Sequence, residues 1–251
     1  MRYLFHHAHP DDETLSTGAI ILGLVSQGHT VLVMTATRGE LGQAVPGSLP
    51  PGADLQQVRI TERREALICL GAHDAGWLGS GPNRASGAQD RTYRDSGMEW
   101  ITPTHAGPSQ QAPPDSLDRA NLEEVIADVM AAGVHHRADR LVSYDARGGY
   151  GHPDHVVCHR STCEAAERLG LDFLEITADP TSSSQWFDES GNPRLLDAHR
   201  SYRSQFSLVS DMVIHVGGQR DRVLWMGGIS MERQCRPIQS HHHTEGEDHV
   251  G

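Results

Sequence analysis

Lysine is absent from this 251-residue chain, whose 21 basic side chains are all arginine. We interpret this absence as a bias of genomic composition rather than as chemistry. The 33 acidic residues leave a formal net charge of −12. Because an acidic surface repels phosphate groups, this balance argues against nucleic acid or an anionic membrane as a partner.

Long hydrophobic runs are also missing. No apolar stretch approaches the length that crosses a membrane, and charge and histidine interrupt the N-terminal apolar run at once, so no signal peptide is predicted. The four cysteines form no CxxC pair, and Cys69 and Cys158 lie in helix-like stretches as expected buried thiols. We therefore expect a reduced, cytoplasmic protein. The sequence leaves the oligomeric state open, a homo-oligomer included.

Several catalytic signatures are lacking as well. No GxGxxG or P-loop follows a strand, and no GxSxG elbow appears, which argues against nucleotide binding and serine hydrolysis. Histidine, by contrast, occurs 17 times. Three of these histidines, His241 to His243, lie near the C-terminus beside acidic residues, and we expect residues 236–251 to form a disordered polar tail.

The hydrophobic pattern predicts an α/β fold. A short strand at 3–5, a helix over 13–27 and a strand at 31–34 form a βαβ unit, which is typical of a parallel sheet. Further helices are expected at 56–70, 117–132 and 153–169, with strands at 140–144 and near 77–78, 173–176 and 223–225, and with a long irregular stretch at 79–114. The expected architecture is a Rossmann-like three-layer sandwich in which residues 1–235 form one domain.

Two short segments carry the chemistry: His9-Pro10-Asp11-Asp12 and, about 140 residues later, His152-Pro153-Asp154-His155. Each follows a predicted strand and precedes a predicted helix. Since such junctions share the carboxyl edge of a parallel sheet, where ligands bind, the two segments are expected to meet there. Imidazole and carboxylate are standard ligands of a divalent metal such as zinc.

The spacing separates ligands from proton carriers. A site built from His9, Asp12 and His155 leaves coordination positions open, which favours catalysis over structural bracing. Asp11 is adjacent to these ligands and is the natural general base for a bound water.

The neighbours of His155 suggest further roles. His152, held by the carboxylate of Asp154, is expected to have a raised pKa and to act as an acid or as an electrostatic partner. Tyr150 precedes it on a glycine-rich turn and can contact a developing oxyanion. The alternative for each segment taken alone is a turn with a helix cap, because proline and aspartate favour both.

At these residues the chain resembles the LmbE/PIG-L family of zinc-dependent N-deacetylases. The resemblance covers about Tyr3 to Cys163, through the motifs Ala8–Glu13 and Tyr144–His155. The likeness is greatest to the actinobacterial branch that contains the N-acetylglucosaminyl-inositol deacetylase and the mycothiol conjugate amidase.

The family implies roles that agree with those argued above. His9, Asp12 and His155 would bind Zn²⁺, Asp11 would be the base, and Tyr150 would contact the oxyanion. His152 would be the acid or electrostatic partner, oriented by Asp154. Two further positions resemble substrate-binding residues of the sugar-inositol deacetylase, namely Arg59 and Asp95, whose groups suit vicinal hydroxyls.

The predicted function is zinc-dependent removal of an acetyl group from an amino sugar, with Fe²⁺ as an alternative metal in the cell. Within the class, the alternatives are an amidase that cleaves a mycothiol-type S-conjugate and a deacetylase of a natural-product sugar. Two alternatives lie outside this class: a non-catalytic sugar-binding module and a metallo-phosphoesterase. The lack of a second metal cluster in the sequence disfavours the phosphoesterase.

Overall fold

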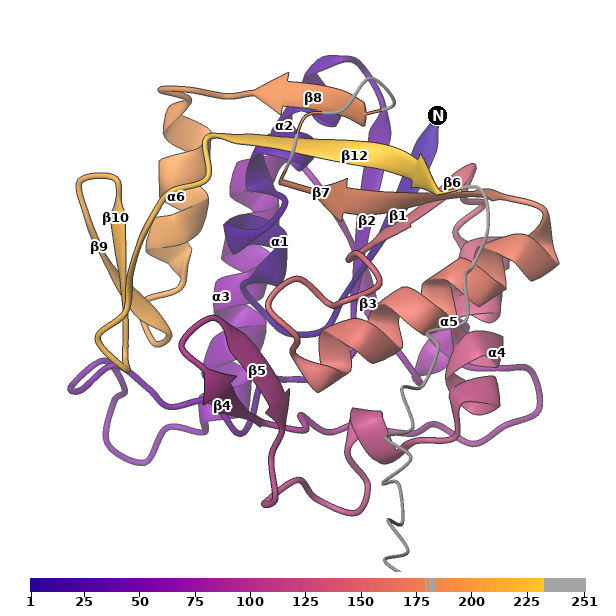
Figure 1. Ribbon diagram of the computed structural model, residues 1–251, viewed down its shortest axis with the longest axis horizontal. Helices are drawn as coiled ribbons and strands as arrows, with labels where there is room; N and C mark the ends of the chain where they lie inside the picture. The colour runs from indigo at the N-terminus through magenta and orange to yellow at the C-terminus, as the bar shows by residue number, and fades with distance from the viewer. Residues whose placement is uncertain (179, 181–183, 233–251) are drawn as a thin grey trace, which may run out of the picture.

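A seven-stranded sheet lies between two groups of helices in the computed structural model, which describes residues 1–178, 180 and 184–232 (Figure 1). The strand order is β3-β2-β1-β6-β7-β12-β8. These strands are β1 (Arg2–His7), β2 (Thr30–Thr35), β3 (His73–Trp77), β6 (Arg140–Ser143), β7 (Asp172–Thr177), β8 (Ser184–Asp188) and β12 (Met226–Glu232). The predicted tail at 236–251 lies outside the described residues, and the single-domain assignment stays a prediction.

The sheet is mainly parallel, as predicted. Strands β1, β2, β3, β6 and β7 run parallel to their neighbours among themselves, and β12 is antiparallel to both β7 and β8. From β1 the chain proceeds outward through β2 to β3, whereas from β6 it proceeds the other way to β7. The strand order therefore reverses between β1 and β6, which is the place where open α/β sheets bind ligands.

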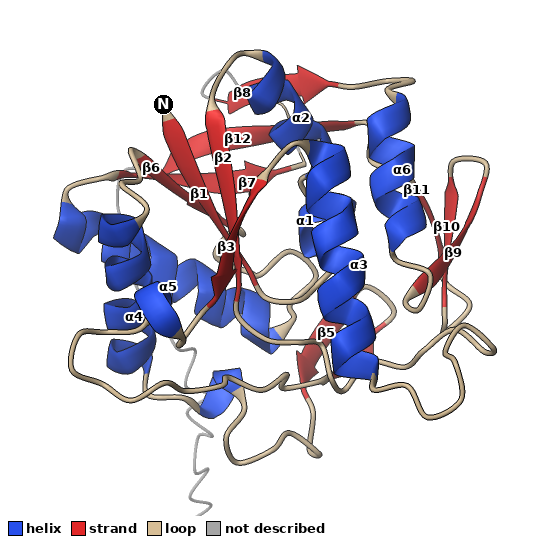
Figure 2. Ribbon diagram, turned by 180° about the vertical axis from the view of Figure 1, so that it is seen from behind, coloured by secondary structure: helices blue, strands red, loops and turns tan. Residues whose placement is uncertain are grey.

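Helices cover both faces of the sheet (Figure 2). They are α1 (Asp12–Leu15), α2 (Gly18–Ser26), α3 (Leu55–Leu70), α4 (Leu122–His135), α5 (Pro153–Leu169) and α6 (Pro193–Ser201). Side chains of β1 alternate between the two faces, so Phe5 packs in the core beneath α2, α3 and α6, while Leu4 packs in the core beneath α4 and α5. The three layers agree with the predicted sandwich.

One predicted helix is interrupted. The chain over 13–27 forms α1 and α2 with a break at Ser16 and Thr17, where φ of Thr17 is −131°. The Thr17 hydroxyl donates to the carbonyl oxygen of Glu13 at 3.0 Å, and it also contacts His7 at 3.0 Å. A side chain that competes for a helix carbonyl and points at a buried partner favours such a break.

The observed bounds of several strands differ from the predicted ones, because pairing with distant strands determines where a strand forms. The strand expected near 77–78 is β3, which ends at Trp77, and the stretch 79–114 contains a hairpin of β4 (Met98–Thr102) and β5 (His105–Pro108). The expected strand at 223–225 is instead the link between β11 (Arg220–Arg222) and β12. Strands β9 (Phe206–Val209), β10 (Met212–His215) and β11 form a small separate sheet.

Helices α3 and α5 match their predictions closely, and each ends at a left-handed glycine, Gly71 and Gly170. Short 3₁₀ turns occur at Gly81–Asn83 and Leu117–Arg119. Within the described ranges, no helix is both long and apolar enough to span a membrane.

The cysteines meet the expectation only in part. Cys158 is a buried free thiol and Cys69 is free and half-buried. Cys163 is disulfide-bonded, so the chain is not wholly reduced as the sequence led us to expect.

Arg63 stabilises the sheet near its carboxyl edge. The β2–β3 ladder shifts register between Val33 and Met34, and the Arg63 guanidinium donates to the Val33 carbonyl oxygen at 2.9 Å and to Thr35 Oγ1 at 2.7 Å. Since both acceptors are buried, we expect Arg63→Met to lower the free energy of unfolding by about 2–4 kcal/mol in urea denaturation. Arg64, the exposed neighbour, provides the control. Arg64→Met should change the free energy of unfolding by less than about 0.5 kcal/mol. Equal effects of the two substitutions would contradict this role.

Candidate metal centre and active site

The first motif forms the turn between β1 and α1. Asp11 has φ 115°, a value that is strained for a residue with a side chain, and its carbonyl oxygen accepts the N–H groups of Thr14 and Leu15 at 2.9 and 2.8 Å. The backbone N–H of His9 donates to Asp12 Oδ2 at 2.8 Å. The turn thereby brings His9, Asp11 and Asp12 to the mouth of the β1–β6 crevice.

The second motif forms the entry to α5. His152 is the residue before the helix, Pro153 occupies its first turn, and the backbone N–H of Asp154 donates to His152 Nδ1 at 3.2 Å. Gly148 has φ 67°, and a Cβ there would lie 2.9 Å from the Cβ of His155. The glycine-rich loop thus packs tightly on α5, whose His155 faces Asp12.

Of the three predicted metal ligands, Asp12 lies close to both histidines, through a different oxygen to each. Asp12 Oδ2 lies 3.4 Å from His9 Nδ1, and Asp12 Oδ1 lies 3.4 Å from His155 Nε2. Donor atoms that share a tetrahedral zinc ion at about 2.0–2.1 Å are separated by roughly 3.3 Å, and each of these two pairs suits such a separation. Among the described residues, the groups whose ligand atoms all lie within 4.8 Å of one another are His9 with His152 and His155, and His9 with Asp95, His152 and Asp154, so Asp12 is close to each histidine but belongs to neither group. His155 Nε2 is buried and has no hydrogen-bond partner among the described residues. A buried imidazole nitrogen that makes no hydrogen bond and faces a carboxylate is suited to bind a cation.

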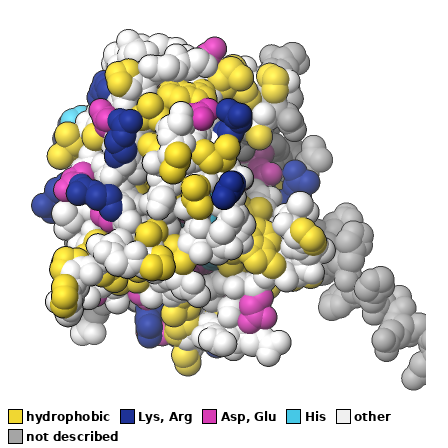
Figure 3. Space-filling model, turned by 90° about the vertical axis from the view of Figure 1, so that its left-hand side faces the viewer, with side chains coloured by type: hydrophobic (Ala, Val, Ile, Leu, Met, Phe, Trp, Pro, Cys, Tyr) yellow, Lys and Arg dark blue, Asp and Glu magenta, His cyan; other side chains and the backbone are white. Residues whose placement is uncertain are grey.

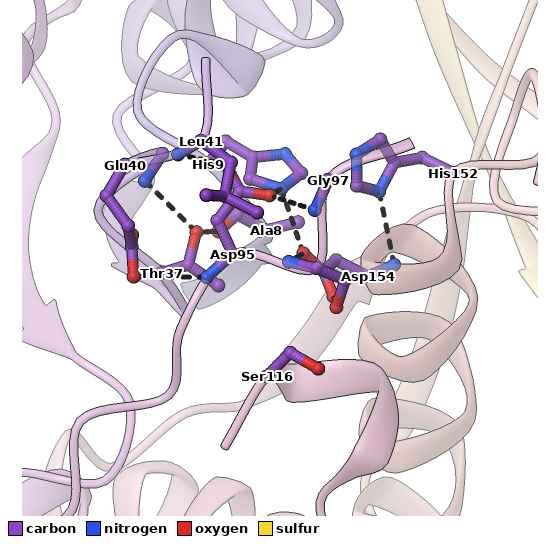
Figure 4. A network of polar contacts seen from close by, with 12 residues as sticks. Ala8, His9, Thr37, Glu40, Leu41, Asp95, Gly97, Ser116, His152 and Asp154 are labelled. Atoms are coloured by element: carbon purple, nitrogen blue, oxygen red, sulfur yellow. Dashed lines mark hydrogen bonds and ion pairs between the residues drawn. The ribbon is translucent and has the colours of Figure 1, made fainter. Parts of the chain in front are cut away.

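Asp154 makes contacts other than the predicted one. Its Oδ2 lies 3.1 Å from His9 Nε2 (Figure 4). The same oxygen accepts the Ser96 N–H at 3.0 Å, and Oδ1 accepts the Ser96 hydroxyl. The carboxylate therefore orients His9, whose second nitrogen faces Asp12, and holds His152 only through the backbone N–H. A carboxylate on the outer nitrogen of a ligating histidine is a recurrent arrangement at metal sites.

The predicted raised pKa of His152 is wrong. Burial, and then the charges of His9 and His155, hold the pKa of His152 well below its ordinary value. Because Nδ1 accepts the Asp154 N–H, the neutral ring carries its proton on Nε2. One ring nitrogen from each of His9, His152 and His155 lies within 4.8 Å of the other two, so His152 is close enough to act on the same centre.

The carboxylates of the first motif differ in their electrostatics. Although burial opposes it, His155 and His9 hold the pKa of Asp12 well below its ordinary value. Burial, and then the charge of Asp12, raises the pKa of Asp11 well above its ordinary value. Two adjacent carboxyl groups with opposite shifts are typical of a division between a metal ligand and a proton acceptor.

Tyr144 is a site residue that the sequence did not single out. Its hydroxyl donates to Asp12 Oδ2 at 2.7 Å and accepts the Ala8 N–H at 2.9 Å, while its ring stacks on His155 at 4.0 Å. Its position directly after β6, opposite the end of β1, was the available signal.

Glu13 is held by a residue from the C-terminal part of the chain. The side chain of Glu13 is completely buried, accepts the Asp11 N–H at 3.2 Å and accepts the Tyr202 hydroxyl at 2.6 Å. Nearby, Gln205 Nε2 donates to the carbonyl oxygen of Pro10 at 2.7 Å. The segment after α6 thus supports the strained turn at Asp11 from behind.

A cavity of about 950 Å³ opens beside these residues. His9, Asp11, Asp12, His152 and both predicted substrate residues line it. Arg59 is almost fully buried, and its guanidinium fills the space that Gly39 and Gly42 leave; a Cβ at either glycine would lie within 2.6 Å of it.

The remaining predicted residues lie on the same cavity. Asp95 accepts the N–H groups of Leu41 at 3.2 Å and Gly97 at 2.7 Å, and its Oδ1 is 3.6 Å from His9 Nε2. Tyr150 lines the cavity with its ring 5.3 Å from that of His155. Partial burial of its phenol, followed by the charge of Asp12, raises the pKa of Tyr150 above its ordinary value, so the hydroxyl keeps its proton.

Comparisons with known proteins agree with the motifs. Residues 4–166 match the family model described as PIG-L, GlcNAc-PI de-N-acetylase. A 1D-myo-inositol 2-acetamido-2-deoxy-alpha-D-glucopyranoside deacetylase of Kineococcus radiotolerans is 41% identical over 65% of this chain and 44% of its own length. The enzyme of the same name from Saccharomonospora viridis is 38% identical over 66% of this chain and 58% of its own length. The chain spans about half the length of the curated relatives it matches.

The fold is similar to that of solved deacetylases. The zinc-inhibited form of teicoplanin deacetylase has a TM-score of 0.57 and 16% identity, covering 94% of this chain and all of that one. At this identity the likeness bears on the fold alone.

The Tyr202–Glu13 contact is expected to contribute to stability. Tyr202→Phe leaves a buried carboxylate oxygen without one of its donors, and we expect the free energy of unfolding to fall by about 1–3 kcal/mol. Tyr3→Phe is the matched control, because Tyr3 is also buried but its hydroxyl contacts the described residues only at 3.4 and 4.0 Å. Thermal or urea unfolding of both variants measures the difference, and the prediction fails if Tyr3→Phe destabilises as much.

Proposed function

The chain belongs to the PIG-L family, and from that premise we propose that it is a zinc-dependent hydrolase that removes an N-acetyl group from an amino sugar and releases acetate. N-acetylglucosaminyl-inositol or a related glycoside is the proposed substrate. The observation that carries the proposal is the position of Asp12 between His9 and His155, 3.4 Å from a ring nitrogen of each, with Asp11 next to it on the wall of the cavity. The cytoplasmic location and the oligomeric state stay predictions.

His9 Nδ1, Asp12 and His155 Nε2 would hold the metal ion. Two imidazole nitrogens and one carboxylate suit zinc, and they suit Fe²⁺ as well. A divalent ion bound there would polarise the amide carbonyl and make an attacking water more acidic. Asp154, which contacts the outer nitrogen of His9, keeps that ring in the orientation for binding.

Asp11 moves the proton in this proposal. Its carboxylate accepts a proton from the water as the water oxygen bonds to the amide carbon. The same carboxyl group then donates that proton to the sugar nitrogen as the C–N bond breaks, which gives acetate and the free amine. A pKa raised by burial and by Asp12 suits a group that must take up a proton and return it.

Tyr150 and His152 stabilise the charge that develops on the carbonyl oxygen. The Tyr150 hydroxyl keeps its proton and faces the cavity, so it can donate to that oxygen. The Nε2 proton of neutral His152 is a second donor on the same side of the cavity. Arg59 and Asp95, which line the same cavity, would bind sugar hydroxyls.

A screen for acetate and free amine tests the proposal. The zinc-loaded protein should release acetate from N-acetylglucosaminyl-inositol or a related N-acetylated glycoside. Cleavage of mycothiol-type S-conjugates without acetate release would instead identify the amidase alternative. Stoichiometric sugar binding that needs no metal and gives no product would identify a sugar-binding module and refute the hydrolase.

The general base can be removed without removing the metal. Asp11→Asn is isosteric and tolerates the left-handed backbone at this position, and the carboxylate is not one of the proposed ligands. We expect the variant to retain its zinc by elemental analysis while kcat falls by about 10²–10⁴-fold. A variant with near-normal kcat would show that another group takes the proton.

Metal content separates ligand histidines from others. His155→Ala removes one of three donors, and we expect zinc content after dialysis to fall from about one equivalent to well below half. His73→Ala, on the exposed part of β3, should keep the full equivalent. Circular dichroism of both variants shows whether the fold is kept, and full zinc retention by folded His155→Ala would refute the ligand assignment.

A further inference from the structure

The outer part of the cavity is apolar, in contrast to its polar floor. Four large hydrophobic side chains that line this cavity are exposed to solvent in the described part of the chain. They are Leu41, Trp100, Tyr150 and Leu224, with exposed fractions of 41, 46, 40 and 55%. We call these four residues the apolar rim. Exposed apolar side chains that gather beside a polar site are typical of ligand recognition.

An aromatic pair leads from the candidate metal centre to the rim. The rings of Trp100 and Tyr150 lie 5.7 Å apart at 33°, and Tyr150 in turn lies 5.3 Å from His155. A backbone hydrogen bond also joins the segments that carry Trp100 and Tyr150. Ala106, which pairs with Trp100 in the hairpin, donates its N–H to the carbonyl oxygen of Tyr150 at 2.8 Å. The β4–β5 hairpin therefore holds Trp100 at a set distance from the reacting centre.

The other rim residues complete two sides of the opening. Leu41 lies against Gly97, just before β4, where a Cβ would be 3.2 Å from its Cδ1. Leu224 belongs to the link between β11 and β12, on the C-terminal side of the cavity. Figure 3 shows the side of the molecule that carries β9 and β10, where hydrophobic side chains lie exposed among arginine and acidic ones.

The charged residues of the β9–β11 wall already have partners. His215 Nε2 lies 3.0 Å from Asp221 Oδ2, and Arg222 lies 2.9 Å from Asp211. A polyol that bound to this wall would compete with these ion pairs for donors and acceptors. The apolar rim has no such occupant within the described residues, so contact with it would remove apolar surface from water without breaking a polar contact.

The size of the cavity leaves room for more than the reacting sugar. Ligand sites typically have about 300–1,000 Å³, and this cavity of about 950 Å³ is near the upper end. A sugar whose acetamido group lies at Asp11 and His152 occupies the inner, polar part. The group attached to the sugar then extends along Tyr150 and Trp100 toward Leu41 and Leu224.

We propose that the apolar rim is a binding site for an aromatic aglycone, so that the preferred substrate is an aryl glycoside of N-acetylglucosamine rather than the inositol glycoside. The inference rests on the proposed deacetylase function for the position of the sugar. An aromatic group stacks on or packs edge-on against Trp100, which contributes attraction beyond that of area burial. Leu41 and Leu224 enclose its remaining edges.

Kinetics with matched glycosides tests the rim. We compare acetate release from the phenyl glycoside and the inositol glycoside of N-acetylglucosamine by the zinc-loaded full chain. The wild-type kcat/KM should be about tenfold or more higher for the phenyl glycoside, and Trp100→Ala should reduce this preference by about tenfold. Ile101→Ala is the control, because Ile101 is exposed on the same hairpin and does not line the cavity; its preference should equal that of the wild type.

Two outcomes would overturn the proposal. One is equal kcat/KM of the wild type for the two glycosides, and the other is a Trp100→Ala variant that keeps the wild-type preference. A binding measurement separates the rim from the reaction: calorimetric titration of zinc-loaded Asp11→Asn with each glycoside gives Kd without turnover. If the wild type releases no acetate but the phenyl glycoside still binds more tightly in a Trp100-dependent way, the proposed function fails and the rim stands. Equal Kd values refute the rim whatever the turnover.

Discussion

The carboxylate of Asp12 joins the three segments that build the site. Its Oδ2 accepts the backbone N–H of His9 in the β1 turn and the hydroxyl of Tyr144 after β6, and its Oδ1 faces His155 on α5. Because β1 and β6 are neighbours where the strand order reverses, one carboxylate can reach both. Together with the contact between Asp154 and His9, this carboxylate joins two motifs about 140 residues apart into one site.

The neighbouring turn stores strain that the rest of the fold supports. Asp11 has a left-handed backbone conformation, and its N–H is held by buried Glu13, which Tyr202 contacts in turn. Gln205 donates to Pro10 in the same turn. Tyr202 and Gln205 lie beyond the residues that match the family model. The part of the chain beyond the family match therefore supports the turn of the HPDD segment. This support keeps Asp11 in a backbone conformation that costs free energy.

The cavity divides into a part for chemistry and a part for selection. Charges and imidazoles gather on its floor, where burial shifts their pKa values in opposite directions. Leu41 and Trp100, which lie outside the two motifs, form the outer part with Leu224. Since the reacting group of an N-acetyl sugar is the same in many glycosides, selection depends on what the outer part binds.

Much of the site could be predicted from the sequence because local patterns determine it. The HPDD and HPDH segments each follow a buried strand and open a helix, and parallel strands bring such junctions to one edge. This was enough to predict the α/β fold and to place His9, Asp11, Asp12 and His155 close together at that edge. Their roles as ligands and base stay predictions. Helix α5 was predicted with its observed bounds, because Pro153 begins it and Gly170 ends it.

The tertiary structure alone decided which groups are partners. Asp154 is next to His155 and near His152 in the sequence, yet its carboxylate contacts His9 and Ser96, which come from other parts of the chain. The pKa of His152 falls because burial and neighbouring rings outweigh a nearby carboxylate. The β4–β5 hairpin lies in a long stretch rich in Gly, Ser and Pro, where the sequence carries no clear strand periodicity. Sequence patterns therefore determined which residues stand at the edge of the sheet, and through-space packing and burial decided what each of them contacts and which charge it carries.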